Sequence, residues 1–185
     1  MAERGWLTMH WPRDYGGQGT SHLRQVIFKE ESFAAGVDAG GFGTTMVGPT
    51  LMLYGSEEHR AAHLPLIVRD GVTWCQGCSE PGSGSDLASL QTRAVKHGDE
   101  CVIRGQKIWP SGAHRAAWIY MLARTDPDAP KHRGISVLLV DLKSPGITIS
   151  PLVQMTGNMA TIRCSLTTCA SPSATALVKS IVAGI

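Results

Sequence analysis

Hydrophobic positions in the first seventy residues recur at the spacing of helices. A first helix is predicted to begin after Ser21, whose hydroxyl suits an N-cap. Four apolar residues of this helix fall near one face: Leu23, Val26, Ile27 and Phe33. A second apolar segment, 44–54, ends at Gly55, which is placed for a left-handed residue after a helix. A third helix is predicted to begin at Ser56, because two acidic residues follow where the helix dipole favours them, and to end at Gly71.

From residue 72 onward the pattern changes to short segments in which polar and apolar residues alternate. Five segments are predicted as strands: 91–96, 101–109, 118–124, 134–141 and 147–153. The first two flank a four-residue turn and are expected to form a hairpin. Helices followed by several short strands predict an α+β chain, with a partial helical N-terminal domain over 1–70 and a small antiparallel β-barrel or a sandwich over 71–158.

Residues 159–185 differ in composition from everything before them. They contain no Asp, Glu or aromatic residue, and 15 of the 27 are Ser, Thr, Ala or Cys. Their hydrophobic periodicity is weak, so we expect this tail to be disordered or docked without regular packing.

The composition of the 185 residues is that of a globular protein, with 43% hydrophobic and 17% charged residues. A formal net charge of +2 gives no reason to expect a nucleic-acid or membrane surface as partner. The first residues carry no apolar region of a signal peptide, which favours a cytoplasmic location. Five cysteines are an odd number, which argues against a disulfide framework.

Two segments carry residue types suited to binding a cofactor. In the Gly/Ser-rich segment 78–86, glycines can turn backbone N–H groups toward an anion and serines add donors, although a flexible surface loop is the alternative. It has neither the Walker nor the Rossmann spacing. Further on, Trp109 can stack on a planar ring while Ser111 donates a hydrogen bond to it. A tryptophan that simply packs the core is the alternative.

Metal chemistry finds weaker support. Cys75 and Cys78 form a CxxC motif, which suits a redox pair or half a zinc site, but no second CxxC follows. His59 and His63 stand four residues apart without the glutamate of an HExxH motif, so a solvated helix face is the preferred interpretation. We therefore predict no metal site.

Segments 79–86 (SEPGSGSD) and 105–111 (GQKIWPS) together resemble the middle domain of the acyl-CoA dehydrogenase family, whose patterns are TEP-x-AGSD and GxKxW. Further similarities follow in the family's order: PRDYGG at 12–17, YGSEE at 54–58 and PGI at 145–147. The resemblance covers about residues 5–158. It implies a flavoprotein fold and an oxidoreductase of fatty acid and lipid metabolism that oxidises acyl-CoA thioesters at the α and β carbons.

The resemblance implies six residues that bind FAD: Cys78, Ser79, Gly84, Ser85, Trp109 and Ser111. The first two would lie along the flavin's pyrimidine edge, and the next two near flavin and thioester phosphates. The tryptophan would cover the isoalloxazine, with the last serine's hydroxyl near N5, which accepts the substrate hydride. One departure from the family is Pro110, which removes a backbone donor and fixes φ.

In the family, a third, helical domain carries the glutamate that removes the α-proton. Nothing in this sequence resembles it, so we expect no catalytic residue here and a fragment that is inactive alone. The implied partners are an acyl-CoA thioester, an electron acceptor resembling electron-transfer flavoprotein, and further subunits of a homo- or hetero-oligomer. Two alternatives stay open: a non-catalytic flavin- or CoA-binding subunit of a hetero-oligomeric dehydrogenase, and a product with no stable fold.

The tail 159–185 is interpreted as the result of a one-base frameshift after Asn158. Read one base back, the codons of 167–169 and 178–184 can encode two motifs that the family has at this spacing.

Overall fold

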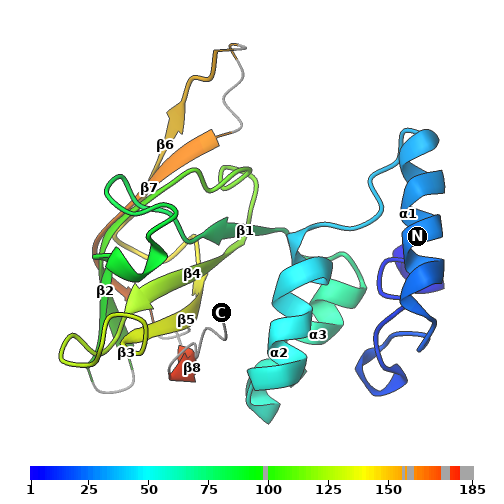
Figure 1. Cartoon of the computed structure of the whole chain (residues 1–185), viewed down its shortest axis with the longest axis horizontal. Helices are drawn as coiled ribbons and strands as arrows, with labels where there is room; N and C mark the ends of the chain where they lie inside the picture. Colours follow the sequence, from blue (N-terminus) through cyan, green and yellow to red (C-terminus); the bar gives the residue numbers. More distant parts are fainter. Residues whose placement is uncertain (98–99, 156, 158–160, 172–175, 180–185) are drawn as a thin grey trace. The chain divides into compact units, whose positions relative to one another are not determined.

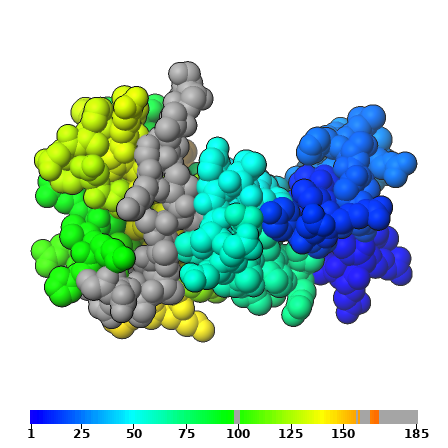
Figure 2. All heavy atoms as spheres, turned by 90° about the horizontal axis from the view of Figure 1, so that it is seen from below, coloured from blue at the N-terminus to red at the C-terminus, as the bar shows by residue number. Residues whose placement is uncertain are grey.

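The computed structural model describes residues 1–97, 100–155, 157, 161–171 and 176–179 (Figure 1). The chain divides into two compact units, a helical unit (Met1–Thr73) and a sheet unit (Trp74–Ile185). In the space-filling view the helical unit runs from blue to turquoise, and the described part of the sheet unit begins in green (Figure 2).

The helical unit contains three α-helices: α1 (His22–Ala34), α2 (Gly48–Tyr54) and α3 (Glu57–Val68). Shorter helical turns precede them: η1 (Ala2–Arg4), η2 (Arg13–Tyr15) and η3 (Gly43–Val47). The predicted start of α3 is confirmed, since the Ser56 hydroxyl accepts a hydrogen bond from the His59 N–H at 3.2 Å. The helix ends earlier than predicted, at Val68, and Asp70 takes the left-handed conformation with φ 55°.

Trp11 is the centre of the helical unit's core. It is 1% exposed, and its indole N–H donates to the Thr44 carbonyl at 3.3 Å. The backbone of Gly48 lies against the ring, because a Cβ there would be 2.1 Å from the Trp11 Cη2 atom. Five aliphatic side chains complete this core: Leu7, Val47, Leu51, Leu64 and Ile67.

The apolar face of α1 is not buried, and one expectation for the helical unit is wrong. Leu23 is 69% and Phe33 is 85% exposed, while Gln25 and Ser32 are buried. Periodicity locates an apolar face, but the packing partner decides which face is covered. Gly55 is extended (φ −70°, ψ 149°) rather than left-handed, and glycine is needed because a Cβ would lie 2.6 Å from the Leu51 carbonyl oxygen.

The sheet unit is a curled eight-stranded sheet in the order β6-β7-β3-β2-β4-β5-β8, with β1 beside β4 (Figure 1). Its strands are β1 (Trp74–Gly77), β2 (Arg93–His97), β3 (Glu100–Ile108), β4 (Trp118–Arg124), β5 (Ile135–Asp141), β6 (Ile147–Leu152), β7 (Thr161–Ser171) and β8 (Ala176–Lys179). The short helical turn η4 (Leu87–Ser89) precedes β2. The α+β class and the hairpin of β2 and β3 are confirmed. The sheet is mixed rather than purely antiparallel, because β1 and β2 both pair with β4 in parallel.

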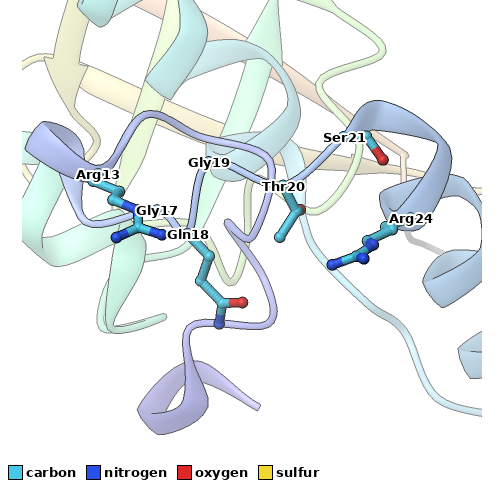
Figure 3. Close-up of a pocket in the computed structure, with 7 residues that line it drawn as sticks. All are labelled: Arg13, Gly17, Gln18, Gly19, Thr20, Ser21 and Arg24. Atoms are coloured by element: carbon cyan, nitrogen blue, oxygen red, sulfur yellow. The ribbon is translucent and has the colours of Figure 1, made fainter.

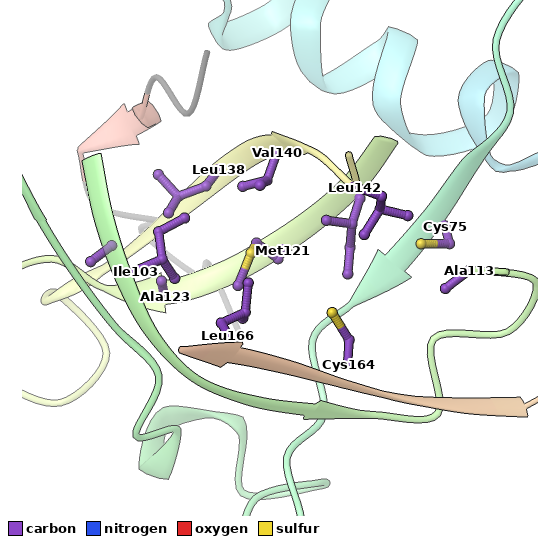
Figure 4. Close-up of a cluster of buried hydrophobic side chains, with 12 residues drawn as sticks. Cys75, Ile103, Ala113, Met121, Ala123, Leu138, Val140, Leu142, Cys164 and Leu166 are labelled. Atoms are coloured by element: carbon purple, nitrogen blue, oxygen red, sulfur yellow. The ribbon is translucent and has the colours of Figure 1, made fainter. Parts of the chain in front are cut away.

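The core of the sheet unit lies on the concave side of this curled sheet (Figure 4). Met121 from β4 and Leu138 from β5 are fully buried, and Ile103 from β3 packs in the same cluster. Residues of β7 contribute as well: Cys164 is 0% and Leu166 is 3% exposed. The core thus contains side chains from β3, β4, β5 and β7.

The expectation of an irregular tail is therefore wrong for residues 161–171 and for residues 176–179, which form β8 and pair antiparallel with β5. Strand β7 pairs antiparallel with β3 on one side and with β6 on the other. Small Ser, Thr and Cys residues are compatible with this position because backbone hydrogen bonds supply the pairing. Of the tail, residues 159–160, 172–175 and 180–185 lie outside the described residues. The frameshift stays a hypothesis about the gene.

Candidate functional site

The loop that follows β1 folds back onto the end of β3, which brings the two resemblance-bearing segments together. The Ser79 carbonyl accepts a hydrogen bond from the Ile108 N–H at 3.0 Å. Ser79 therefore lies across from the residue that immediately precedes Trp109. Ser79 and Trp109, thirty positions apart in the sequence, are thus brought together at the C-terminal end of β3, a place called the edge from here on.

A buried ion pair fixes this junction. The Lys107 Nζ lies 2.8 Å from the Glu80 Oε1, and the two side chains are 0% and 6% exposed. Lys107 also donates to the Cys78 carbonyl at 3.3 Å. The Glu80 carboxylate accepts the N–H groups of Gln91 at 2.6 Å and Thr92 at 2.9 Å. The pair is therefore well satisfied, as a buried pair must be.

The electrostatics of the pair follow from these contacts. Burial on its own would raise the pKa of Glu80, but the hydrogen bonds from Lys107, Thr92 and Gln91, with the positive charge of Lys107, hold it below its ordinary value. Burial lowers the pKa of Lys107, and Glu80 opposes that shift. Glu80 is therefore a structural carboxylate, already bound on both oxygens.

Gly105 explains the glycine of the GxKxW pattern. A Cβ at this position would lie 2.3 Å from the Thr92 Oγ1 and 2.7 Å from its Cα. The register of β3 against β7 shifts between Ile103 and Gly105, which marks a bulge. Because Gly105 has no side chain, Thr92, which directly precedes β2 and is held by Glu80, can lie against β3.

The Gly/Ser segment is a fixed turn in its inner part rather than a flexible loop. Glu80 and Ser83 exchange backbone hydrogen bonds at 2.7 and 3.0 Å, and the Ser83 hydroxyl donates to the Asp86 carbonyl at 2.7 Å. The Asp86 carboxylate accepts from the Ser89 hydroxyl. Gly84 and Ser85 are exposed, and a Cβ added at Gly84 would meet no atom within 4 Å. The outer rim of the turn is therefore open to a ligand.

Trp109 does not pack the core, so that alternative is wrong: the residue is 58% exposed. Its φ of 67° lies in the left-handed region, which is strained for a residue with a bulky side chain. Pro110 behind it is buried, and the Ser111 N–H donates to the Trp109 carbonyl at 2.8 Å. This tight turn presents an indole ring and, two residues on, an exposed hydroxyl.

The two cysteines of the CxxC motif have ordinary structural environments. Cys75 lies in β1, and burial, with a smaller effect of Cys164, raises its pKa to about 12. Cys78 follows the strand half-buried, accepts a hydrogen bond from Gln76 at 3.2 Å, and has a pKa raised by burial. Among the described residues no group of His, Cys, Asp or Glu is arranged to hold a metal ion. His63 lies on a buried rather than a solvated helix face, at 8% exposure, which corrects the sequence interpretation.

A separate depression of about 830 Å³ lies in the helical unit, at the start of α1 (Figure 3). It is lined by Arg13, Gly17, Gln18, Gly19, Thr20, Ser21 and Arg24. The two arginines make it positively charged, and it contains none of the six predicted residues. No helix in the described part of the chain has the length and apolar character needed to cross a membrane.

Sequence reasoning assigned no role to Lys107 or Thr92. A lysine inside an alternating strand is an observable signal, but its partner Glu80 stands 27 positions away. Of the six predicted residues, hydrogen bonds tie Cys78 and Ser79 to the segment that carries Trp109 and Ser111. Gly84 and Ser85 lie on the open rim of the same loop.

Comparison with known proteins gives matches over nearly the whole chain. Residues 1–70 match the family model for the N-terminal domain of acyl-CoA dehydrogenases, and residues 75–169 match the model for their middle domain. The acyl-CoA dehydrogenase IpdE1 of Mycobacterium tuberculosis is 44% identical over 159 residues, which are 85% of this chain and 41% of that protein.

Two solved structures are similar in fold. One is described as the Tcur3481–Tcur3483 steroid ACAD, with TM-score 0.87 and 42% identity over 93% of this chain and 44% of the other. The second is the ChsE4–ChsE5 complex of Mycobacterium tuberculosis, with TM-score 0.86 and 39% identity over 94% and 45%. The chain thus spans less than half the length of these relatives.

Proposed function

Because the chain belongs to the acyl-CoA dehydrogenase family, we propose that its sheet unit supplies a flavin-contacting edge to an FAD-dependent acyl-CoA dehydrogenase. The observation that carries the proposal is the exposed Trp109, held on a fixed turn and connected by its neighbour Ile108 to Ser79. A large aromatic ring that is exposed at a rigid position suits stacking on a planar cofactor. The substrate class is an acyl-CoA thioester, oxidised between its α and β carbons.

The residues present fit a flavin. Trp109 offers a stacking face, while Ser79 and Ser111 offer hydroxyl groups at the same edge. The open backbone at Gly84 and Ser85 offers N–H groups to a phosphate. When bound, FAD supplies the hydride acceptor, and the chain's residues orient its ring and keep water from one face.

The buried acid of this loop is not available as a general base. Glu80 is ion-paired and accepts two backbone N–H groups, so both of its oxygens are bound. Asp86 is exposed and accepts a hydrogen bond from Ser89. A base must reach the proton it removes with a free lone pair, and its loss costs at least about a hundredfold in rate. We therefore propose that this chain alone does not turn over acyl-CoA, and that the base comes from another polypeptide segment.

The test measures the Kd of the purified chain for FAD, with the quenching of flavin fluorescence as the signal for binding. Trp109→Ala is expected to weaken binding by about 1 kcal/mol, roughly fivefold in Kd, whereas Trp109→Phe keeps most of it. Tyr54→Ala is the matched control, since this aromatic residue is 63% exposed in the helical unit. An affinity unaffected by Trp109→Ala would refute the assignment of this edge.

A second candidate is a non-catalytic subunit of a hetero-oligomer. It is favoured by one structural neighbour's being a complex of two proteins. The chain would then contribute flavin or CoA contacts to a partner dehydrogenase in the cytoplasm, which passes electrons to an acceptor resembling electron-transfer flavoprotein. Expression beside a dehydrogenase encoded next to its gene tests this: a co-eluting, flavin-loaded complex supports a subunit, and separate elution excludes it.

A further inference from the structure

The buried pair of Lys107 and Glu80 joins the three backbone segments that meet at the proposed flavin edge. Lys107 belongs to β3 and reaches the Cys78 carbonyl, while Glu80 reaches the first residues that lead into β2. The hydrogen bond from the Ile108 N–H to the Ser79 carbonyl joins β3 to the loop after β1, as the bond from Lys107 to Cys78 does. A single charged pair therefore sits where the Ser79 side and the Trp109 side are connected.

We propose that Lys107 and Glu80 are positioning residues, which hold Ser79 and Trp109 in the geometry that receives the flavin ring. This inference rests on the proposed function for its ligand. Neither side chain reaches the ligand itself, because both are almost fully buried. They act through the backbone of Cys78 and through the continuous stretch Lys107–Trp109.

The chemistry of the pair explains why it controls position rather than merely filling space. Each charge is buried without access to water, so each needs the other, and removal of one leaves the other uncompensated. The ammonium has only three donors, and two of them go to Glu80 and Cys78. Displacement of either segment would break a charge-assisted hydrogen bond, which is stronger and more geometrically demanding than a neutral one.

Trp109 is sensitive to this anchoring because its backbone is strained. A left-handed conformation in a tryptophan persists only where its surroundings hold it. Lys107 stands two residues before Trp109, and the N–H of Ser111, two residues after it, donates to the Trp109 carbonyl. Release of the lysine therefore frees the preceding strand end and lets the indole ring leave its presented orientation.

The test compares four variants of the full chain labelled with 5-fluorotryptophan: Glu80→Gln, Lys107→Met, the double variant of both, and Leu138→Ala. The Trp109 resonance is assigned from Trp109→Phe. Leu138 is fully buried in the same unit but outside the pair, so it serves as a control for lost stability alone. The double variant contains no uncompensated charge and keeps the test usable where a single variant fails to fold.

Both single variants are expected to shift or broaden the Trp109 fluorine resonance without any ligand, and to speed exchange of the Gln91 and Thr92 amides at least tenfold. They are also expected to raise the Kd for FAD at least fivefold. Leu138→Ala is expected to lower the melting temperature while leaving the Trp109 resonance and the Kd unchanged. The double variant should be no worse than either single variant, because the two residues act as one unit.

Two results would overturn the positioning role. One is a Trp109 resonance and amide exchange in Glu80→Gln and in the double variant that match the wild type. The other is a change in Leu138→Ala as large as in the pair variants, which would make the pair merely structural. Absence of FAD binding by the wild type refutes the proposed function instead, while the fluorine and exchange measurements still decide the positioning.

Discussion

Gly105→Ala is the most direct test of how the candidate site is built. The added methyl group would lie 2.3 Å from the Thr92 Oγ1, 2.6 Å from its Cβ and 2.7 Å from its Cα. Rotation of the threonine side chain relieves only the first of these contacts. The Cα cannot retreat easily, because the Thr92 N–H is held by Glu80 and the residue is 1% exposed.

The cost follows from this geometry. Overpacking of a well-packed core usually costs about 1–3 kcal/mol, and a clash with anchored backbone belongs at the upper end of that range. For a unit of this size each kcal/mol lowers the melting temperature by about 4–8 °C, so we expect a drop of roughly 10–20 °C. Thermal unfolding followed by circular dichroism measures it.

Two further variants sharpen the measurement. Gly84→Ala is the matched control, since a Cβ there meets no atom within 4 Å and we expect no change beyond about 0.5 kcal/mol. Thr92→Gly in the Gly105→Ala background removes two of the three clashing atoms and should recover part of the loss. A melting temperature of Gly105→Ala equal to the wild type would refute the close packing of β2 on β3 at this site.

The remaining predictions concern the helical unit. Phe33→Ser should leave the free energy of unfolding in urea within about 0.5 kcal/mol of wild type, because the side chain is 85% exposed; a loss above 1 kcal/mol would mean that this face of α1 is covered in solution. Burial, with a smaller effect of the neighbouring His59, lowers the pKa of His63 below its ordinary value of 6.5. Stability from this neutral histidine is thus complete above the unfolded-state pKa and is lost as the pH falls through the folded-state pKa. The urea midpoint should fall on acidification from about pH 7.5 to 5.5, and His63→Gln should flatten that dependence; an equally steep profile in the variant would assign it to other groups.

Local features of the fold were predictable because neighbouring residues determine them. Ser56 precedes α3, as its hydroxyl and the following acids indicate, and β2 pairs antiparallel with β3, the next strand along the chain. Features that depend on distant partners were not predictable. The apolar face of α1 is exposed, and the parallel pairing of β1 with β4 joins Trp74 to Trp118, 44 positions later. Strand β7 was not predicted, because the alternation of exposed Arg163 with buried Cys164 and Leu166 is short and stands among small polar residues.

The candidate site shows the same division. The motif pattern singled out two segments, and the structure brings them together through a hydrogen bond from Ile108 to Ser79. The structure gives the physical reason for the GxKxW pattern. Its glycine leaves room for Thr92, its lysine is buried against Glu80, and its tryptophan is exposed. Only the last of these residues is available to a ligand. The other two are required because they hold it in place.

This division of roles also limits the chemistry that the edge can perform. The charged groups of the motif are bound to each other: Glu80 forms an ion pair with Lys107 and accepts two backbone N–H groups. To act as a base, this carboxylate would have to leave the pair, and the lysine would then lie buried without a counter-ion. An oxidation that removes a proton and a hydride therefore needs a base other than this carboxylate. The ion pair that holds Ser79 and Trp109 in the proposed geometry thus keeps Glu80 from acting as a base.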